Sequence, residues 1–140
     1  MIAACVIDAS VAIKWMITEE GTDAANRLRW NGTAFHAPDL IVPEAGNILW
    51  KKIQRDELTL GEAELACELL GLANIQIHPM GPLAPAALRM AVALKHPVYD
   101  TTYLALAQSL DMPMVTADRR LVNRLAAFGN PAFPELVLLS

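Results

Sequence analysis

No apolar stretch in this sequence approaches the roughly 18 residues that a membrane-spanning helix needs. The first residues have neither the basic region nor the apolar segment of a secretory signal peptide. Low-complexity tracts, internal repeats and linkers rich in Gly or Pro are also absent. We therefore expect a cytoplasmic protein with no membrane partner, folded as a single domain over residues 1–140.

Cysteine is scarce and the histidines are scattered. Cys5 and Cys67 lack the CxxC spacing of zinc or redox sites, so we expect two buried thiols. His36, His78 and His96 show no HxxxH or HExxH spacing, which favours structural or surface roles over metal ligation. The sequence thus argues against a disulfide framework and a zinc site.

Positive charge is also in short supply. Eleven basic residues face 15 acidic ones, and the formal net charge is −4. This balance argues against broad, nonspecific binding to nucleic acid but leaves room for a local basic rim. The apolar fraction is high, at 54%, with a mean hydropathy of +0.33. Because this exceeds what a core of this size needs, we expect a further apolar interface with another copy or a partner.

Short apolar runs alternate with longer segments of helical period. The predicted strands cover 4–7, 34–36, 75–78, 114–116 and 136–139. The predicted helices cover 10–17, 20–29, 39–55, 60–72, 82–95, 100–110 and 118–127. This alternation predicts an α/β fold with a mainly parallel central sheet covered by helices on both faces. In such sheets, ligands bind beyond the carboxyl ends of the strands.

Several residues have the chemistry of helix starts. Thr59 and Glu62 are spaced as a capping box, and Asp100 and Asp118 lie where an N-cap is expected. These signals support the helices predicted after each of them.

Acidic residues recur directly after apolar runs. Asp8 ends "VID", Asp100 ends "PVYD" and Asp118 ends "MVTAD". Glu44 lies early in the predicted helix 39–55, with Asn47 one turn later on the same side. The pattern predicts that these acids gather at one edge of the sheet.

Taken singly, each acid has an ordinary structural explanation. Asp100 and Asp118 suit helix caps, Asp8 suits a turn, and Glu44 suits the first turn of a helix, where the helix dipole favours negative charge. Gathered at one edge, however, they repel one another and need a counter-charge, which the lysines on the predicted helices do not obviously supply. A divalent cation such as Mg²⁺ or Mn²⁺ suits carboxylate ligands, and its associated chemistry is phosphodiester hydrolysis.

With these acids in view, the sequence resembles the PIN-domain ribonucleases, and among them the VapC-like toxins of type II toxin–antitoxin systems. The resemblance covers nearly the whole chain, through "VIDASVAIKWMITEE", "APDLIVPEAGNILWKKIQRDELT" and "VYDTTYLALAQSLDMPMVTADRRL". The order Asp8, Glu44, Asp100, Asp118 matches the acidic quartet of the family residue for residue.

The resemblance implies a PIN-like three-layer α/β/α sandwich and a Mg²⁺- or Mn²⁺-dependent endoribonuclease. It also implies an RNA substrate, a cognate antitoxin that blocks the site, and a homodimer. By position, Asp8 and Asp100 are the direct metal ligands, and Glu44 and Asp118 complete the site directly or through water. Which acid serves as general base is left open.

Further residues accompany the quartet. Ser10 in "DAS" and Thr116 in "TAD" match small polar neighbours that family members use to orient carboxylates or water, and Asn47 is a third supporting polar residue. The candidates for RNA contact are Lys14, Arg119, Arg120 and Arg124. For these basic residues, phosphate contact and an ordinary solvated helix face remain equal alternatives. For Trp15, Trp30 and Trp50 we expect packing rather than stacking on bases.

Three other functions compete with the nuclease. A receiver domain would need an acidic pair after the first strand, a phosphoacceptor Asp after the third and a Lys after the last, and the sequence has none of these. A haloacid-dehalogenase-type phosphatase would need a second Asp where Ser10 stands. A catalytically inactive PIN-like module that binds RNA or protein remains the alternative, and metal-dependent cleavage separates it from the enzyme.

Overall fold

A five-stranded sheet forms the centre of the molecule in the computed structural model, which describes residues 2–129 and 133–139. The strands are β1 (Ala4–Ile7), β2 (Ala34–Pro38), β3 (Ile75–His78), β4 (Met114–Thr116) and β5 (Leu136–Leu138). Their order in the sheet is β3-β2-β1-β4-β5, and every pairing is parallel. Residues 1, 130–132 and 140 of the predicted domain lie outside the described residues.

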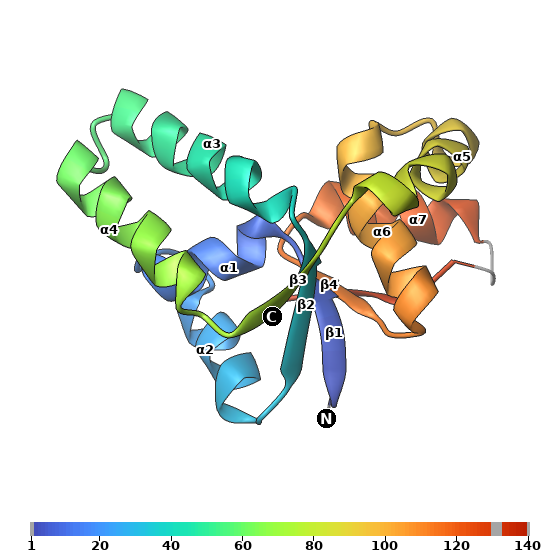
Figure 1. Ribbon diagram of the computed structural model, residues 1–140, viewed down its shortest axis with the longest axis horizontal. Helices are drawn as coiled ribbons and strands as arrows, with labels where there is room; N and C mark the ends of the chain where they lie inside the picture. The colour runs from blue at the N-terminus through green and yellow to red at the C-terminus, as the bar shows by residue number, and fades with distance from the viewer. Residues whose placement is uncertain (1, 130–132, 140) are drawn as a thin grey trace.

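Seven α-helices cover the two faces of this sheet among the residues described. They are α1 (Ala9–Met16), α2 (Thr22–Trp30), α3 (Ile41–Gln54), α4 (Leu60–Gly71), α5 (Ala84–Leu94), α6 (Val98–Leu110) and α7 (Arg119–Phe128). Helices α1 to α4 lie on one side of the sheet and α5 to α7 on the other (Figure 1). The predicted three-layer α/β/α sandwich with a mainly parallel sheet is confirmed.

Strands β1 and β2 run upward in Figure 1, from the N-terminus at the bottom, so their carboxyl ends lie between α3 and the α5–α6 pair. Strand β1 is central, and its residues Cys5 to Ile7 are fully buried. Helix α6 packs across the sheet and is buried at every position from Thr101 to Ala107. This edge of the sheet is therefore framed by deeply buried elements of the core.

The predicted helices and strands are present. Their boundaries differ from the prediction where a proline or a capping residue sets the first residue of a helix. Helix α6 begins at Val98, not at Asp100, because Pro97 occupies the N-cap position with extended backbone. The expectation that Asp100 caps a helix is therefore wrong, whereas Asp118 caps α7 as predicted. The capping box of Thr59 and Glu62 is also confirmed, at the start of α4.

The expectation of two buried thiols is confirmed for one cysteine and wrong for the other. Cys5 is buried in β1, and this burial raises the pKa of its thiol to about 12. Cys67, however, is exposed, because α4 is an outer helix that turns only Ala63 and Ala66 fully inward. A sequence with apolar residues on several sides of α4 does not reveal which side faces the core.

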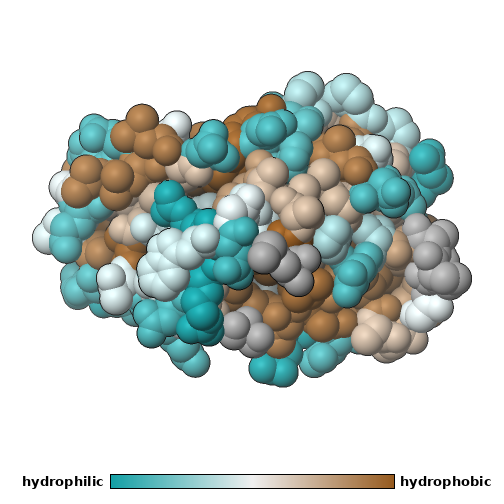
Figure 2. All heavy atoms as spheres, turned by 90° about the horizontal axis from the view of Figure 1, so that it is seen from below, coloured by the Kyte–Doolittle hydropathy of each residue, from teal (hydrophilic) through white to brown (hydrophobic). Residues whose placement is uncertain are grey.

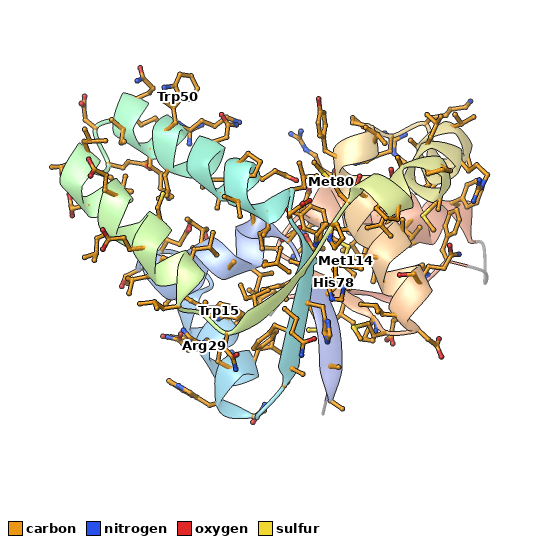
Figure 3. All side chains as sticks on the ribbon, viewed as in Figure 1. Trp15, Arg29, Trp50, His78, Met80 and Met114 are labelled. Atoms are coloured by element: carbon orange, nitrogen blue, oxygen red, sulfur yellow. The ribbon has the colours of Figure 1, made fainter. Side chains whose placement is uncertain are left out.

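The tryptophans divide in the same way. Trp15 packs as expected, with its ring 4.7 Å from that of Phe35 and its Nε1 donating to the carbonyl of Ala25 at 2.8 Å. Trp50 points outward from α3 and is 55% exposed, and Trp30 is 76% exposed, so the packing expected for these two is wrong (Figure 3). Helical periodicity predicts which residues share one face of a helix. It does not predict how much of that face neighbouring elements cover.

Apolar side chains reach the surface at several places. Figure 2, which views the molecule from below, shows apolar atoms interspersed with hydrophilic ones across this face. Large exposed apolar residues lie on α4 and α5, among them Leu65, Leu69, Leu88 and Val92. Within the described part of the chain, no helix has the length and apolarity needed to cross a membrane.

Candidate active site

Asp8 stands where β1 ends and α1 begins. Its side chain is only 6% exposed and caps the helix by accepting from the backbone N–H of Val11 at 3.3 Å. Two hydroxyls donate to the same carboxylate, Ser10 Oγ to Oδ1 and Thr116 Oγ1 to Oδ2, both at 2.5 Å. Each carboxylate oxygen is therefore held by a donor, and the orientation of Asp8 is fixed by hydrogen bonds before any ligand binds.

The same hydroxyls tie Asp8 to the loop between β4 and α7. Ser10 Oγ accepts from the backbone N–H of Ala117 at 3.1 Å, and Thr116 Oγ1 accepts from the backbone N–H of Asp118 at 3.1 Å. Asp118 Oδ1 then accepts from the N–H groups of Arg120 at 2.9 Å and Leu121 at 3.4 Å, which caps α7. The structure thus joins Asp118 to Asp8 through Thr116.

Glu44 and Asp100 come to the site from helices rather than from strands. Glu44 lies in the first turn of α3, and Asp100 in the first turn of α6. The apolar run before Asp100, "PVYD", is the proline-led start of α6, and this helix carries the acid to the edge of the sheet. Parallel sheets of this kind place helix ends as well as strand ends along the same rim.

The carboxylate of Glu44 is incompletely paired. Its Oε1 is buried and has no hydrogen-bond partner among the residues that the structure describes, and the same holds for the hydroxyl of Tyr103. Burial raises the pKa of Tyr103, and the charge of Glu44 raises it further, while Tyr103 opposes the rise at Glu44. A buried, unpaired carboxylate oxygen is costly and indicates a missing partner.

Burial and mutual repulsion act on these acids together. Burial raises the pKa of Asp8, and the negative charge of Asp100 adds to the rise, against the hydrogen bonds from Ser10, Thr116 and Val11. Burial also raises the pKa of Glu44 to about 7, with further increments from Asp100 and Asp8. Asp8, Glu44 and Asp100 therefore share one electrostatic environment that disfavours three negative charges without a cation.

The donor set suits a hard divalent cation. Among residues 2–129 and 133–139, no three His, Cys, Asp or Glu side chains stand close enough together to form a ready-made metal cage. Mg²⁺ does not require one, because it usually takes one or two protein carboxylates and keeps several waters. The unpaired oxygen of Glu44 and the repulsion between the acids fit such an ion.

Some of the predicted supporting residues contact the acids and others do not. Ser10 and Thr116 contact Asp8 directly, whereas Asn47 is exposed on α3 and has no recorded contact with the acids. Arg119 and Arg120 are exposed at the start of α7, beside Asp118.

The other two basic candidates are engaged in the fold. Lys14 donates to the carbonyl of Glu20 at 2.8 Å and pairs with Glu19 at 3.7 Å. Arg124 donates to the carbonyls of Leu94 and Lys95, at the end of α5. Both side chains therefore hold structural contacts that an RNA phosphate would have to displace.

Two residues near the acids, His96 and Tyr103, are not among the site residues predicted from the sequence. His96 Nε2 lies 2.5 Å from Asp100 Oδ2, where we expected only a structural or surface role rather than metal ligation. The other two histidines do pair structurally, His36 Nδ1 with His78 Nε2 at 2.9 Å, between β2 and β3. The signal for His96 was its spacing of four residues before Asp100. Tyr103, one helical turn after the same acid, carried a similar one.

The sequence profile of the family described as PIN domain matches residues 5–127, so the chain belongs to the PIN domain family. Ribonuclease VapC3 of Pyrobaculum aerophilum is 32% identical over 130 residues, which cover 90% of this chain and 98% of the relative. Ribonuclease VapC1 of Mycobacterium tuberculosis is 30% identical over 135 residues, with 95% and 97% covered. The similarity extends over almost the full length of each relative.

Solved structures agree on the fold. The crystal structure of PAE2754 from Pyrobaculum aerophilum aligns with a TM-score of 0.65 and 27% identity, covering 86% of each chain. VapC20 of Mycobacterium tuberculosis, described as a toxin that cleaves the sarcin–ricin loop, aligns with a TM-score of 0.68 and covers 88% of this chain and 94% of that one. At 14% identity, the latter likeness concerns the fold alone.

Proposed function

We propose that this chain is a Mg²⁺- or Mn²⁺-dependent endoribonuclease and the toxin of a toxin–antitoxin pair. The observation that carries the proposal is the shared environment of Asp8, Glu44 and Asp100, three acids whose repulsion calls for a cation. The PIN family and the relatives named VapC ribonucleases support RNA as the substrate. Nothing in the structure favours the inactive binding module over the enzyme.

In this proposal, Asp8 and Asp100 bind the cation directly, and Glu44 and Asp118 complete the site. When bound, the cation would lower the pKa of a coordinated water and stabilise the charge on the scissile phosphate. The chain itself supplies the positioning: Ser10 and Thr116 hold the carboxylate of Asp8, and α6 brings Asp100 to it. Glu44, with a pKa of about 7 in the metal-free chain, can exchange a proton at neutral pH.

For RNA contact we propose Arg119 and Arg120, because both are exposed and adjoin Asp118. Phosphate contacts of this kind position a strand without reading its sequence. Lys14 and Arg124 are weaker candidates, since each already holds structural contacts.

The proposal is tested by incubating total RNA with the purified chain in Mg²⁺, Mn²⁺ or EDTA, beside the double variant Asp8→Asn/Asp100→Asn. We expect discrete products that EDTA and the double variant both abolish. The matched control is Asp56→Asn/Asp111→Asn, which removes two charges at helix ends where both residues adopt positive φ, a conformation that Asn accepts. Cleavage should persist in this control.

Two outcomes would contradict the proposal. Cleavage that survives the loss of both Asp8 and Asp100 would place the activity elsewhere. Equal inertness of the parent and the double variant, with both still binding RNA or a partner, would favour the binding module.

The toxin assignment also implies partners. We propose a cognate antitoxin and a homodimer, because large apolar residues on α4 and α5 remain exposed in the described fold and would be covered by a partner. Light scattering coupled to size-exclusion chromatography tests the dimer, and a monomer at micromolar concentration would contradict it. Rescue of growth by a neighbouring gene, when this chain is expressed, tests the antitoxin.

A further inference from the structure

The turn between α5 and α6 holds a histidine against one of the proposed metal ligands. His96 Nε2 lies 2.5 Å from Asp100 Oδ2, and the two side chains are 14% and 28% exposed. Contacts this short and this sheltered are uncommon for surface pairs, which exchange their partners with water. The pair therefore constrains the carboxylate of Asp100 in a way that the rest of the site does not.

The position of His96 is set by the fold around it. Lys95 ends α5 in the left-handed conformation, at φ 53°, and the backbone N–H of His96 donates to the carbonyl of Ala91 at 3.1 Å. Pro97 follows directly and fixes the entry to α6. The imidazole is thus delivered to Asp100 by a turn with little freedom on either side.

Arg124 braces the same turn from α7. Its Nη1 donates to the carbonyls of Leu94 and Lys95, immediately before His96. The helix that Asp118 caps therefore also steadies the histidine that contacts Asp100. This connection gives Arg124 a place in the site without any contact with RNA.

The chemistry of the contact determines which atom donates the hydrogen bond and which accepts it. An ionised carboxylate can only accept, so Nε2 of His96 carries the hydrogen and donates it to Oδ2. Because Oδ2 accepts this hydrogen bond, rotation of the Asp100 carboxylate is restricted, and Oδ1 remains available to bind a cation. Metal-binding side chains are commonly oriented by such outer partners, whose loss weakens metal binding.

We propose that His96 is a positioning residue which, by donating from Nε2 to Oδ2 of Asp100, holds that carboxylate in the orientation that binds the divalent cation. The inference rests on the proposed metal-dependent nuclease and extends it to a residue outside the acidic quartet. Asp8 is oriented by Ser10 and Thr116, and His96 has the corresponding task for Asp100.

The alternative is that the pair merely stabilises the start of α6, because His96 and Asp100 are four residues apart across the N-cap. Two substitutions separate these roles. His96→Leu keeps similar bulk but removes the donor, whereas His96→Gln returns an N–H donor near the position of Nε2. His78→Leu is the matched control, because it removes a histidine that pairs with His36 rather than with an acid.

The experiment measures Mn²⁺ affinity by isothermal titration calorimetry and electron paramagnetic resonance, with thermal melting in EDTA for each variant. We expect His96→Leu to weaken Mn²⁺ binding about tenfold. His96→Gln should recover most of the affinity, and His78→Leu should leave it unchanged. These readouts do not depend on RNA cleavage.

Several results would overturn the proposal. If His96→Leu lowers the melting temperature but binds Mn²⁺ as the parent does, the pair serves the helix start alone. Tighter binding in His96→Leu would mean that the imidazole competes with the cation for Asp100. If the parent chain itself binds no Mn²⁺, the metal dependence of the proposed nuclease fails, and this role of His96 fails with it. Normal binding by the parent and by His96→Leu rejects the role of His96 alone.

Discussion

The acids of the site are held in two different ways. On the strand-borne side, Asp8 and Asp118 are fastened by Ser10, Thr116 and backbone N–H groups, all within the β1–α1 and β4–α7 connections. On the helix-borne side, Glu44 has an unpaired buried oxygen and Asp100 has His96 as its recorded hydrogen-bond partner. The first pair is organised before a ligand arrives, whereas the second pair retains bonding capacity for one.

This difference follows from where hydrogen-bond donors are found. Connections that leave a parallel strand present free N–H groups and short hydroxyl side chains at the sheet edge, so an acid there is readily satisfied. An acid in the first turn of a helix that faces the core meets mainly apolar neighbours. We infer that Asp8 anchors the cation from the strand-borne side. On the helix-borne side, Asp100, held by His96, binds the cation, and Glu44 responds to its charge.

The largest effect in this comparison is expected at Thr116. Thr116→Val keeps the shape but removes the donor to Asp8 and the acceptor for the N–H of Asp118. The free energy of unfolding should fall by about 1–3 kcal/mol in urea denaturation, because two buried polar groups lose a partner. Mn²⁺ affinity should fall about tenfold in calorimetry.

Thr33→Val is the control for this change. Thr33 is also buried and donates to a backbone carbonyl, that of Ile2 at 2.7 Å, at the opposite end of the sheet. It should cost comparable stability without altering Mn²⁺ affinity. Equal Mn²⁺ affinity in Thr116→Val and the parent would show that the strand-borne side does not anchor the cation.

An intermediate effect is expected at Glu44 as a function of pH. Its pKa in the folded chain is raised to about 7 from an ordinary value near 4.5, so the native state holds a proton that the unfolded state releases. Between these two values the stability of the metal-free chain therefore falls as pH rises. Glu44→Gln cannot ionise and should flatten this fall when melting temperature is measured from pH 4.5 to 8 in EDTA.

Adding the cation gives a second test of the same prediction about Glu44. Mg²⁺ or Mn²⁺ should raise the melting temperature of the parent more at pH 8 than at pH 5, because the ionised acids bind it better. An unchanged pH dependence in Glu44→Gln would mean that the unpaired oxygen is not a source of strain in the metal-free site.

The smallest effect is expected at the exposed rim. Arg120→Ala should weaken the binding of RNA to a cleavage-deficient Asp8→Asn background and reduce the slope of log affinity against log salt by about one. Fluorescence anisotropy at several salt concentrations measures both quantities. Arg55→Ala, at the far end of α3 from Glu44, serves as the charge-matched control and should leave the slope unaltered. The same slope in Arg120→Ala as in the parent would remove Arg120 from the RNA contacts.

Much of the fold could be predicted from the sequence because its signals are local. Alternating apolar runs, the capping box at Thr59 and the N-cap at Asp118 depend on neighbours a few residues away. The start of α6 was misplaced because two local signals compete there, a capping acid and a proline, and the proline decides the entry to the helix. The exposure of Cys67 and Trp50 was missed because it depends on how far a neighbouring layer extends.

The sequence by itself determined the α/β architecture and the order of the four acids, because periodicity, capping and residue type are written along the chain. Only the tertiary structure decided how those acids differ. The hydrogen bond between Thr116 and Asp8 spans 108 residues. The electrostatic interaction of Glu44 with Tyr103 and Asp100 depends on where the fold places α3 and α6 relative to the sheet. Such contacts arise from packing and desolvation, which no short segment of sequence contains.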